Sequence, residues 1–463
     1  MIKKILAALA LLALIGGGLA VWKGSGVAHA ANGYAAKWVC SSVHVTGRSA
    51  EQAMAEMPPN PLARWLVLED TERGATVSMA GMAPRRAEFR GDDLGCTLVP
   101  PGRGADALAP VEVGDWRPAE SAAPGPAAGS ETPADAAQAD LEKLAGALDR
   151  AFSDPNPEKP RRTRAVVVLH RGERIAERYA EGFSAETPLT GWSMTKSVMN
   201  ALIGRAVALG RIEPIDRPAP VPEWSGAEDA RGAITTDHLL RMSSGLSFEE
   251  NYANLFSDAM RMLFVEGDAA AVAAASRPDG PPDSSWSYSS GTSNLLSRLL
   301  RDQLGAEAYG RFPREQLFAP LGMRSARLEA DASGVFVASS FGWATARDWA
   351  RFGQLYLQDG VWEGQRLLPE GWVDYSRRPT PEAPRGIYGA QFWLNAGEPG
   401  DPDSRRWPQM PADAYWASGH AGQFVVIVPS RRCVIVRLGL NHHRGEWSLG
   451  DFVADVLDAL PAA

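Results

Sequence analysis

Residues 118–136 are built almost entirely from Ala, Pro, Gly, Ser and Glu and show no apolar periodicity. Such a composition is typical of a flexible linker rather than of a packed element. The chain has 463 residues, which is more than one hydrophobic core usually holds. We therefore expect two folding units, a small α+β unit over residues 31–117 and a larger domain over residues 137–463.

The first 30 residues have the features of an export signal. Lys3 and Lys4 precede an apolar run over residues 5–21, and residues 28–30 (Ala-His-Ala) fit a small-x-small cleavage site. A run of about 17 residues is also long enough to stay in place as a membrane anchor. Both alternatives remain open. Either one predicts a periplasmic or other extracytoplasmic protein, and the second predicts a tether to the inner membrane.

The three cysteines fit an oxidising compartment. Cys40 and Cys96 lie in the small unit, and Cys433 lies far away in an apolar, strand-like run. We expect a Cys40–Cys96 disulfide, which would close a loop of about 56 residues and stabilise the fold by roughly 4 kcal/mol. The alternative is three unpaired, buried thiols. No CxxC or CxxH spacing indicates a metal site.

The pattern of apolar residues predicts an α+β fold in both units. The small unit should contain a helix at 50–57 and strands at 65–69 and 75–79. The larger domain should begin with a helix at 137–152 and strands at 165–169 and 175–179, and it should end with strands at 424–428 and 433–436 and a helix at 449–460. Because the stretch between these ends is mainly helical, we expect an antiparallel sheet flanked by helices, with a helical subdomain beside it.

Lysine is rare in this chain, with seven lysines against forty arginines, and Lys196 is the single lysine after residue 159. It follows Ser193 by three residues at the start of a helical pattern, so the two side chains should share one helix face. A buried amine can lose its proton and act as a base, whereas a guanidinium cannot. We therefore interpret Ser193 as a nucleophile at a helix N-terminus, where the helix dipole favours an alkoxide, and Lys196 as its base.

Two further motifs can supply groups that assist the Ser193–Lys196 pair. Tyr288-x-Ser290 precedes a helical stretch, and a tyrosine near an ammonium can hold a lowered pKa and relay protons. His420-x-Gly422 leads through Gln423 into an apolar strand, where a backbone N–H can hold an oxyanion. Each motif alone would be read as an ordinary polar loop or turn.

In this order, the three motifs resemble those of the serine β-lactamase, D,D-peptidase and esterase superfamily. The likeness extends over most of residues 137–463, including Leu-Leu-Arg-Met-Ser-Ser-Gly-Leu at 239–246. The Tyr-x-Ser and His-x-Gly forms are closest to class C-like members, and residues 248–252 and 419–423 resemble 6-aminohexanoate-dimer hydrolases. This resemblance implies a β-lactamase/transpeptidase-like fold with no metal or cofactor. It also implies that Tyr252 contacts the substrate, and it makes Asp258 a weaker candidate for binding a substrate amine.

The resemblance implies a serine hydrolase that cleaves a small-molecule amide or ester through an acyl-enzyme on Ser193. Lys196 and Tyr288 would move the proton, the backbone N–H groups of Ser193 and Gln423 would hold the oxyanion, and Ser290, His420 and Gly422 would complete the site. β-Lactamase or D,D-peptidase activity on cell-wall-type substrates, and a catalytically silent envelope-binding module, remain alternatives. The formal net charge of -8 argues against nucleic acid as a partner.

Overall fold

The computed structural model describes residues 26–59, 63–114, 139–226, 228–443, 445 and 447–461. The apolar run at 5–21 and the predicted linker at 118–136 lie outside these ranges, so both assignments remain predictions. Within the described ranges, no helix is long and apolar enough to cross a membrane. Residues 28–30, the expected cleavage site, lie inside a helix that covers residues 26–44.

The small N-terminal unit consists of this helix, a short second helix and an antiparallel four-stranded sheet. The sheet has the strand order β1-β2-β3-β4, and α2 begins with a capping box in which Ser49 and Gln52 exchange hydrogen bonds. Its elements are α2 (Ala50–Ala55), β1 (Leu66–Thr71), β2 (Gly74–Met79), β3 (Met82–Phe89) and β4 (Cys96–Leu98). The predicted helix and both predicted strands are confirmed. A disulfide joins Cys40 in the 26–44 helix to Cys96 in β4.

The larger domain is organised around an antiparallel six-stranded sheet of order β12-β13-β14-β15-β5-β6. Its strands are β5 (Thr163–His170), β6 (Glu173–Tyr179), β12 (Trp393–Leu394), β13 (Tyr415–Gly419), β14 (Gln423–Val428) and β15 (Cys433–Gly439). All four predicted strands are present. The pairing of β15 with β5 joins the two ends of the domain in the interior of the sheet.

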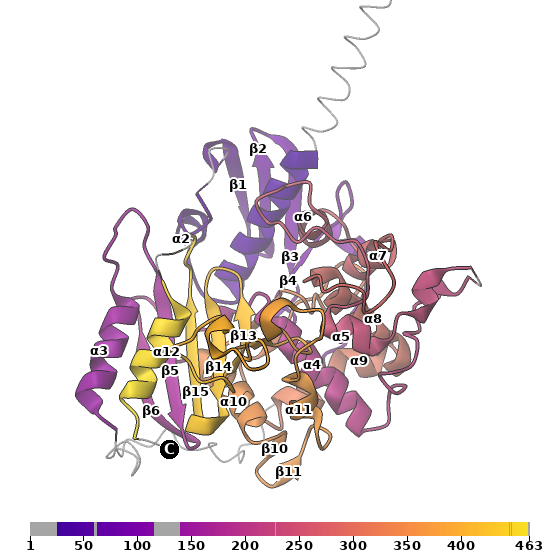
Figure 1. Cartoon of the computed structure of the whole chain (residues 1–463). Coiled ribbons are helices and arrows are strands. Elements are labelled where there is room, and N and C mark those ends of the chain that lie inside the picture. The colour runs from indigo at the N-terminus through magenta and orange to yellow at the C-terminus, as the bar shows by residue number, and fades with distance from the viewer. Residues whose placement is uncertain are drawn as a thin grey trace, which may run out of the picture.

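Helices cover both faces of this sheet (Figure 1). The terminal helices α3 (Leu141–Phe152) and α12 (Leu449–Asp458) pack together on one face, and α10 (Ala346–Leu357) lies on the other. Alternate residues of β5 pack against the helices on opposite faces of the sheet. Val166 and Val168 belong to one apolar cluster, and Val167 belongs to the other. Full burial of each such valine contributes about 1.5–3 kcal/mol to stability.

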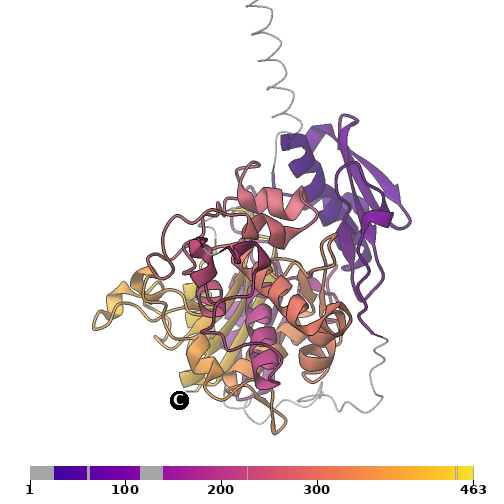
Figure 2. The same ribbon diagram turned by 90° about the vertical axis from the view of Figure 1, so that its right-hand side faces the viewer.

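The helical subdomain lies beside the sheet and contains most of the remaining elements (Figure 2). These are α4 (Met194–Ala208), α5 (Thr236–Arg241), α6 (Asp258–Phe264), α7 (Ala269–Ala274), α8 (Ser290–Leu304), α9 (Ala306–Pro313) and α11 (Trp372–Ser376), with a small sheet of β7 (Leu189–Thr190), β8 (Arg327–Leu328) and β9 (Gly342–Ala344) and a hairpin of β10 (Val361–Trp362) and β11 (Gln365–Arg366). The predicted α+β fold, with an antiparallel sheet, flanking helices and a helical subdomain, is confirmed.

The N-terminal unit packs directly against this domain (Figures 1 and 2). Residues of the 26–44 helix share one apolar cluster with Trp192, with α6 and with Phe341. The contact is close at Gly33, where a Cβ would lie 2.1 Å from the carbonyl oxygen of Phe264. Only glycine fits there, because any side chain would push the two helices apart.

Candidate active site

Ser193 stands immediately before α4, as its N-cap residue, and its side chain makes no capping hydrogen bond. Two hydrogen bonds, one on each side of Ser193 in the sequence, stabilise the turn that contains it. Gly191 donates its N–H to the carbonyl of Gly342 at 2.8 Å, and the Thr195 hydroxyl donates to the carbonyl of Trp192 at 2.6 Å. The Ser193 hydroxyl is therefore available for chemistry at a helix N-terminus, where backbone N–H groups favour negative charge.

Lys196 lies one turn into α4 and points back at this hydroxyl. Its Nζ donates to Ser193 Oγ at 3.0 Å, to Ser290 Oγ at 2.9 Å and to the backbone carbonyl of Ser339 at 3.0 Å. The residue is 1% exposed, and burial lowers the pKa of its amine to about 8, while the charge of Glu250 acts in the opposite direction. The sequence-based pairing of Ser193 with Lys196 is thus present in space.

The Tyr288-x-Ser290 motif meets Lys196 from the opposite side. Ser290 opens α8, and the ring centroid of Tyr288 lies 4.9 Å from Lys196 Nζ. Burial, together with Tyr388 and Glu250, raises the pKa of Tyr288 well above its usual value. The expectation of a lowered tyrosine pKa is therefore wrong. Desolvation of the phenolate is the largest cause of this rise, so the Tyr288 hydroxyl keeps its proton near neutral pH.

Glu250 is a site residue that sequence reasoning missed. Its carboxylate accepts the Ser290 hydroxyl at 2.5 Å and the Ser290 N–H at 2.7 Å, and it also accepts the Tyr252 hydroxyl at 3.3 Å. The only signal was its position between Phe248 and Tyr252, in a stretch that resembles one family. Glu249, beside it in the sequence, has the same chemistry, and nothing local distinguishes the two.

Asp258, the carboxylate proposed from the sequence for binding an amine, has a different environment. It begins α6, accepts the N–H of Glu249 at 2.9 Å and pairs with Arg261 at 3.5 Å. These contacts fix the loop that carries Glu250 and Tyr252. The structure therefore places Glu250, not Asp258, beside Ser290 and Lys196.

The third motif forms a tight turn between β13 and β14. His420, Ala421 and Gly422 make up the turn, with φ values of 60° at Ala421 and 85° at Gly422. The strand before the turn reaches the nucleophile loop, because a Cβ on Gly419 would lie 2.0 Å from the carbonyl oxygen of Gly191. This close approach explains the glycine that precedes the histidine.

Of the residues in and next to this turn, His420 contacts the site, whereas the side chain of Gln423 contacts the sheet. The His420 ring lies against Trp192 at 5.5 Å and against Tyr252 at 5.3 Å, measured between ring centroids. Gln423 pairs with Gly419 across the hairpin, and its side-chain amide exchanges hydrogen bonds with the backbone of Gly439 at 2.6 and 3.0 Å. The side chain of Gln423 therefore joins the β13–β14 turn to β15, and only its backbone remains for a catalytic role.

Aromatic rings extend the site on the Tyr288 side. Tyr388 lies 5.8 Å from Tyr288 and Trp393 lies 5.3 Å from it, between ring centroids, and Trp286 packs against both neighbours. An apolar wall of this kind can hold a hydrocarbon chain next to the reacting bond. Local patterns do not predict this wall, because it joins two segments that are far apart in the sequence, one with Trp286 and Tyr288 and the other with Tyr388 and Trp393.

An antiparallel sheet flanked by helices, with a buried serine and lysine at the start of a helix that contacts β13 and β14, defines a hydrolase of the β-lactamase fold. Residues 141–443 match the sequence profile of the Beta-lactamase family. The chain therefore belongs to the β-lactamase family.

The chain is also similar to individual proteins. The 6-aminohexanoate-dimer hydrolase of Paenarthrobacter ureafaciens is 26% identical over an alignment of 269 residues, and the alignment covers 52% of this chain and 66% of that protein. The match thus spans just under two thirds of the relative. A Bacillus anthracis protein, provisionally named a 6-aminohexanoate-dimer hydrolase, is 23% identical with a TM-score of 0.54 and covers 69% of this chain and 83% of its own. A family VIII carboxylesterase is 16% identical with a TM-score of 0.51, over 69% of this chain and 96% of its own. At these identities the two structures show the fold alone.

Proposed function

We propose that this protein is a serine hydrolase that cleaves an amide or ester bond through an acyl-enzyme on Ser193. The observation that carries the proposal is the 3.0 Å contact between Lys196 Nζ and Ser193 Oγ, made by an amine whose pKa is lowered to about 8. At pH 7 roughly a tenth of such an amine is neutral. A base with a pKa this close to the working pH is well matched to proton transfer.

The reaction would run in two halves. Neutral Lys196 accepts the proton of Ser193 as Oγ forms a bond to the substrate carbonyl carbon. The tetrahedral intermediate then collapses, the C–N or C–O bond breaks, and the leaving group takes the proton from Lys196, directly or through the hydroxyl of Tyr288. Water next attacks the acyl-enzyme and gives its proton to Lys196, the bond between the acyl carbon and Ser193 Oγ breaks, and Lys196 returns the proton to Oγ to regenerate the hydroxyl.

The oxyanion would be held by two backbone N–H groups. One is that of Ser193 at the N-terminus of α4. The second comes from the β13–β14 hairpin, which contains both His420 and Gln423 and reaches the nucleophile loop at Gly419. The sequence-based choice of the Gln423 N–H remains a prediction within this hairpin.

The surroundings of the site favour a particular substrate class. The aromatic wall of Trp286, Tyr288, Tyr388 and Trp393 suits an extended hydrocarbon chain, and the Glu250 carboxylate favours a cationic group nearby. A short linear amide or ester with a free amine combines both properties. The Paenarthrobacter relative, named for hydrolysis of the 6-aminohexanoate dimer, supports this class.

We also propose that the protein works outside the cytoplasm. The Cys40–Cys96 disulfide supports this location, because such bonds persist in oxidising compartments. The apolar run at residues 5–21 would direct export or provide a tether to the inner membrane.

The test is covalent labelling of the full chain with a fluorophosphonate, followed by mass spectrometry and a panel of p-nitrophenyl esters, β-lactams and short linear amides. We expect a single adduct on Ser193 that is absent from Ser193→Ala. Ser197→Ala is the matched control, since its hydroxyl lies on the same helix but donates to the carbonyl of Gln391 at 2.6 Å. An adduct that persists in Ser193→Ala would remove Ser193 from this role.

A further inference from the structure

Trp192, the residue before the nucleophile, has an unusual backbone conformation. Its φ is 46°, in the left-handed region that residues with a Cβ rarely adopt. Such a conformation persists only where the surrounding structure enforces it. Since Ser193 follows directly, the conformation of Trp192 sets the direction in which Ser193 enters α4.

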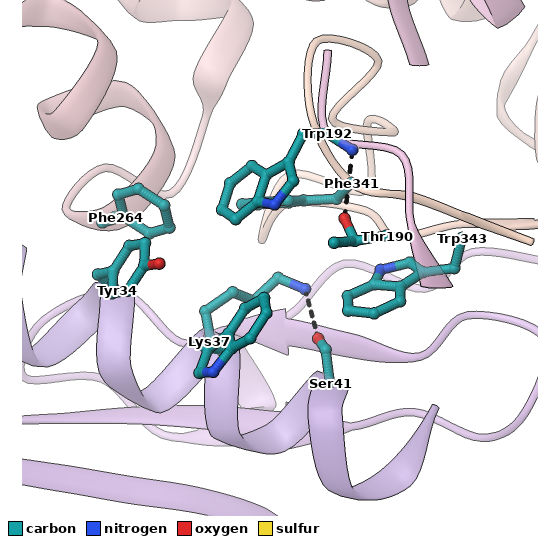
Figure 3. Close-up of a pocket in the computed structure, with 9 residues that line it drawn as sticks. Tyr34, Lys37, Ser41, Thr190, Trp192, Phe264, Phe341 and Trp343 are labelled. Carbon is teal, nitrogen blue, oxygen red and sulfur yellow. Dashed lines mark hydrogen bonds between the residues drawn. The ribbon is translucent and has the colours of Figure 1, made fainter. Parts of the chain in front are cut away.

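Two aromatic side chains of the N-terminal unit hold Trp192 in place. Tyr34 stacks on the Trp192 ring at 6.4 Å with a 10° angle between the ring planes, and Trp38 stacks at 6.3 Å and 11°. They are four residues apart in the 26–44 helix, so they share one helix face. Figure 3 shows Tyr34 and Trp192 beside a small cavity between the two units. We call Tyr34 and Trp38 the aromatic clamp.

The helix that carries the clamp is fixed to the larger domain by a buried ion pair. Lys37, between the two clamp residues, pairs with Glu329, and their side chains are 4% and 0% exposed. The same carboxylate accepts the Ser41 hydroxyl at 2.8 Å, the Cys96 N–H at 2.7 Å and the Trp343 indole N–H at 2.7 Å. A charge pair buried this completely tolerates little displacement, because separating its partners would leave an unpaired buried charge.

We propose that the N-terminal unit is part of the catalytic machinery, because its aromatic clamp keeps Trp192 left-handed and thereby aims Ser193 at Lys196. The inference rests on the proposed function. It makes Trp192 and Trp38 positioning residues, although the 26–44 helix lies outside the matched residues 141–443. Without the clamp, residue 192 relaxes toward negative φ and the Ser193 hydroxyl leaves its hydrogen bond with Lys196.

The first test measures single-turnover acylation by a p-nitrophenyl ester in Trp38→Ala, Trp38→Phe and Val77→Ala. Val77 is buried in β2 of the same unit, so Val77→Ala controls for general loss of stability. We expect Trp38→Ala to lower the acylation rate constant at least about tenfold, because small displacements of reacting groups are costly. The half-saturating ester concentration should change less than about threefold, and Trp38→Phe, which keeps a ring, should recover most of the rate.

The second test isolates the backbone conformation and does not depend on the folding of Trp38→Ala. Trp192→Gly and Trp192→Ala lose the same ring contacts, but only glycine adopts positive φ without a steric penalty. We expect Trp192→Gly to acylate about fivefold or more faster than Trp192→Ala, the factor set by the left-handed penalty of a residue with a Cβ. A purely structural role of the ring predicts no such advantage for glycine.

The outcomes separate this inference from the proposed function. If the wild type forms no adduct on Ser193, the proposed function is wrong and the inference falls with it. If the wild type reacts normally and Trp192→Ala matches or exceeds Trp192→Gly, only the inference is wrong. Equal losses in Val77→Ala and folded Trp38→Ala would also overturn it, since the effect would then be one of stability.

Discussion

Glu250 is joined to Ser290 by two hydrogen bonds, one from the Ser290 hydroxyl at 2.5 Å and one from its backbone N–H at 2.7 Å. Because Ser290 also accepts a hydrogen bond from Lys196, the Glu250 carboxylate is separated from the Lys196 amine by a single side chain. Burial lowers the pKa of Lys196 and Glu250 raises it. The balance of the two effects leaves the amine with a pKa of about 8, suited to a base that must release its proton again.

The first prediction concerns the pH dependence of acylation. Lys196 acts as a base only when it is neutral, so the acylation rate should rise about tenfold per pH unit below pH 8 and level off above it. The measurement is single-turnover acylation of the wild type between pH 5.5 and 9.5, with circular dichroism at each pH. A rate that stays constant across this range would show that no group with this pKa limits acylation.

The second prediction concerns Glu250→Gln. Removal of the negative charge takes away the interaction that raises the pKa of Lys196, so the midpoint of the pH profile should move to lower pH. The plateau rate should fall by less than about tenfold, because glutamine retains a hydrogen-bond acceptor for Ser290. Glu249→Gln is the matched control, since that side chain is exposed and accepts instead from Asn254. A midpoint that moved to higher pH would contradict this account.

The third prediction is that Lys196→Arg is nearly as damaging as Lys196→Ala. A guanidinium stays protonated and cannot take the proton of Ser193, although it preserves the positive charge. Each variant should lose at least about 10²-fold in the acylation rate, the lower end of what general-base assistance contributes. Single-turnover kinetics at several pH values provide the measurement. An arginine variant within about tenfold of the wild type would mean that Lys196 supplies charge and not base catalysis.

The fourth prediction concerns the cysteines. Non-reducing peptide mapping of protein exported from cells should recover Cys40 linked to Cys96 and Cys433 as a thiol. Cys433 should resist alkylation until the protein unfolds, because burial raises the pKa of its thiol to about 12. Cys40→Ser with Cys96→Ser should lower the free energy of unfolding by roughly 4 kcal/mol. Recovery of both cysteines as free thiols from rapidly alkylated protein would exclude the bond.

Much of the fold follows from local sequence patterns. The β5–β6 and β14–β15 hairpins, the terminal helices and the serine–lysine pair were all predicted, because each depends on residues a few positions apart. The spacing of Ser193 and Lys196 on one helix is the clearest case. Three residues along a helix return a side chain to the same face, whatever the rest of the protein does.

Relationships across long stretches of sequence were decided by packing alone. Lys196 meets Ser290 across 94 residues, and Lys37 meets Glu329 across 292. No periodicity encodes such contacts. They arise when apolar faces of separate elements are buried together, and so the choice of Glu250 as the site carboxylate was invisible in the sequence.

The sequence by itself therefore determined the pairing of Ser193 with Lys196, since a lone lysine three positions after a serine is a local and compositional signal. Only the tertiary structure decided their properties. The pKa values of Lys196 and Tyr288 depend on how completely water is excluded, and the Trp192 ring stacks on Trp38, which lies far earlier in the chain. Burial and long-range contact are properties of the assembled fold, because they exist only when distant segments occupy the same volume.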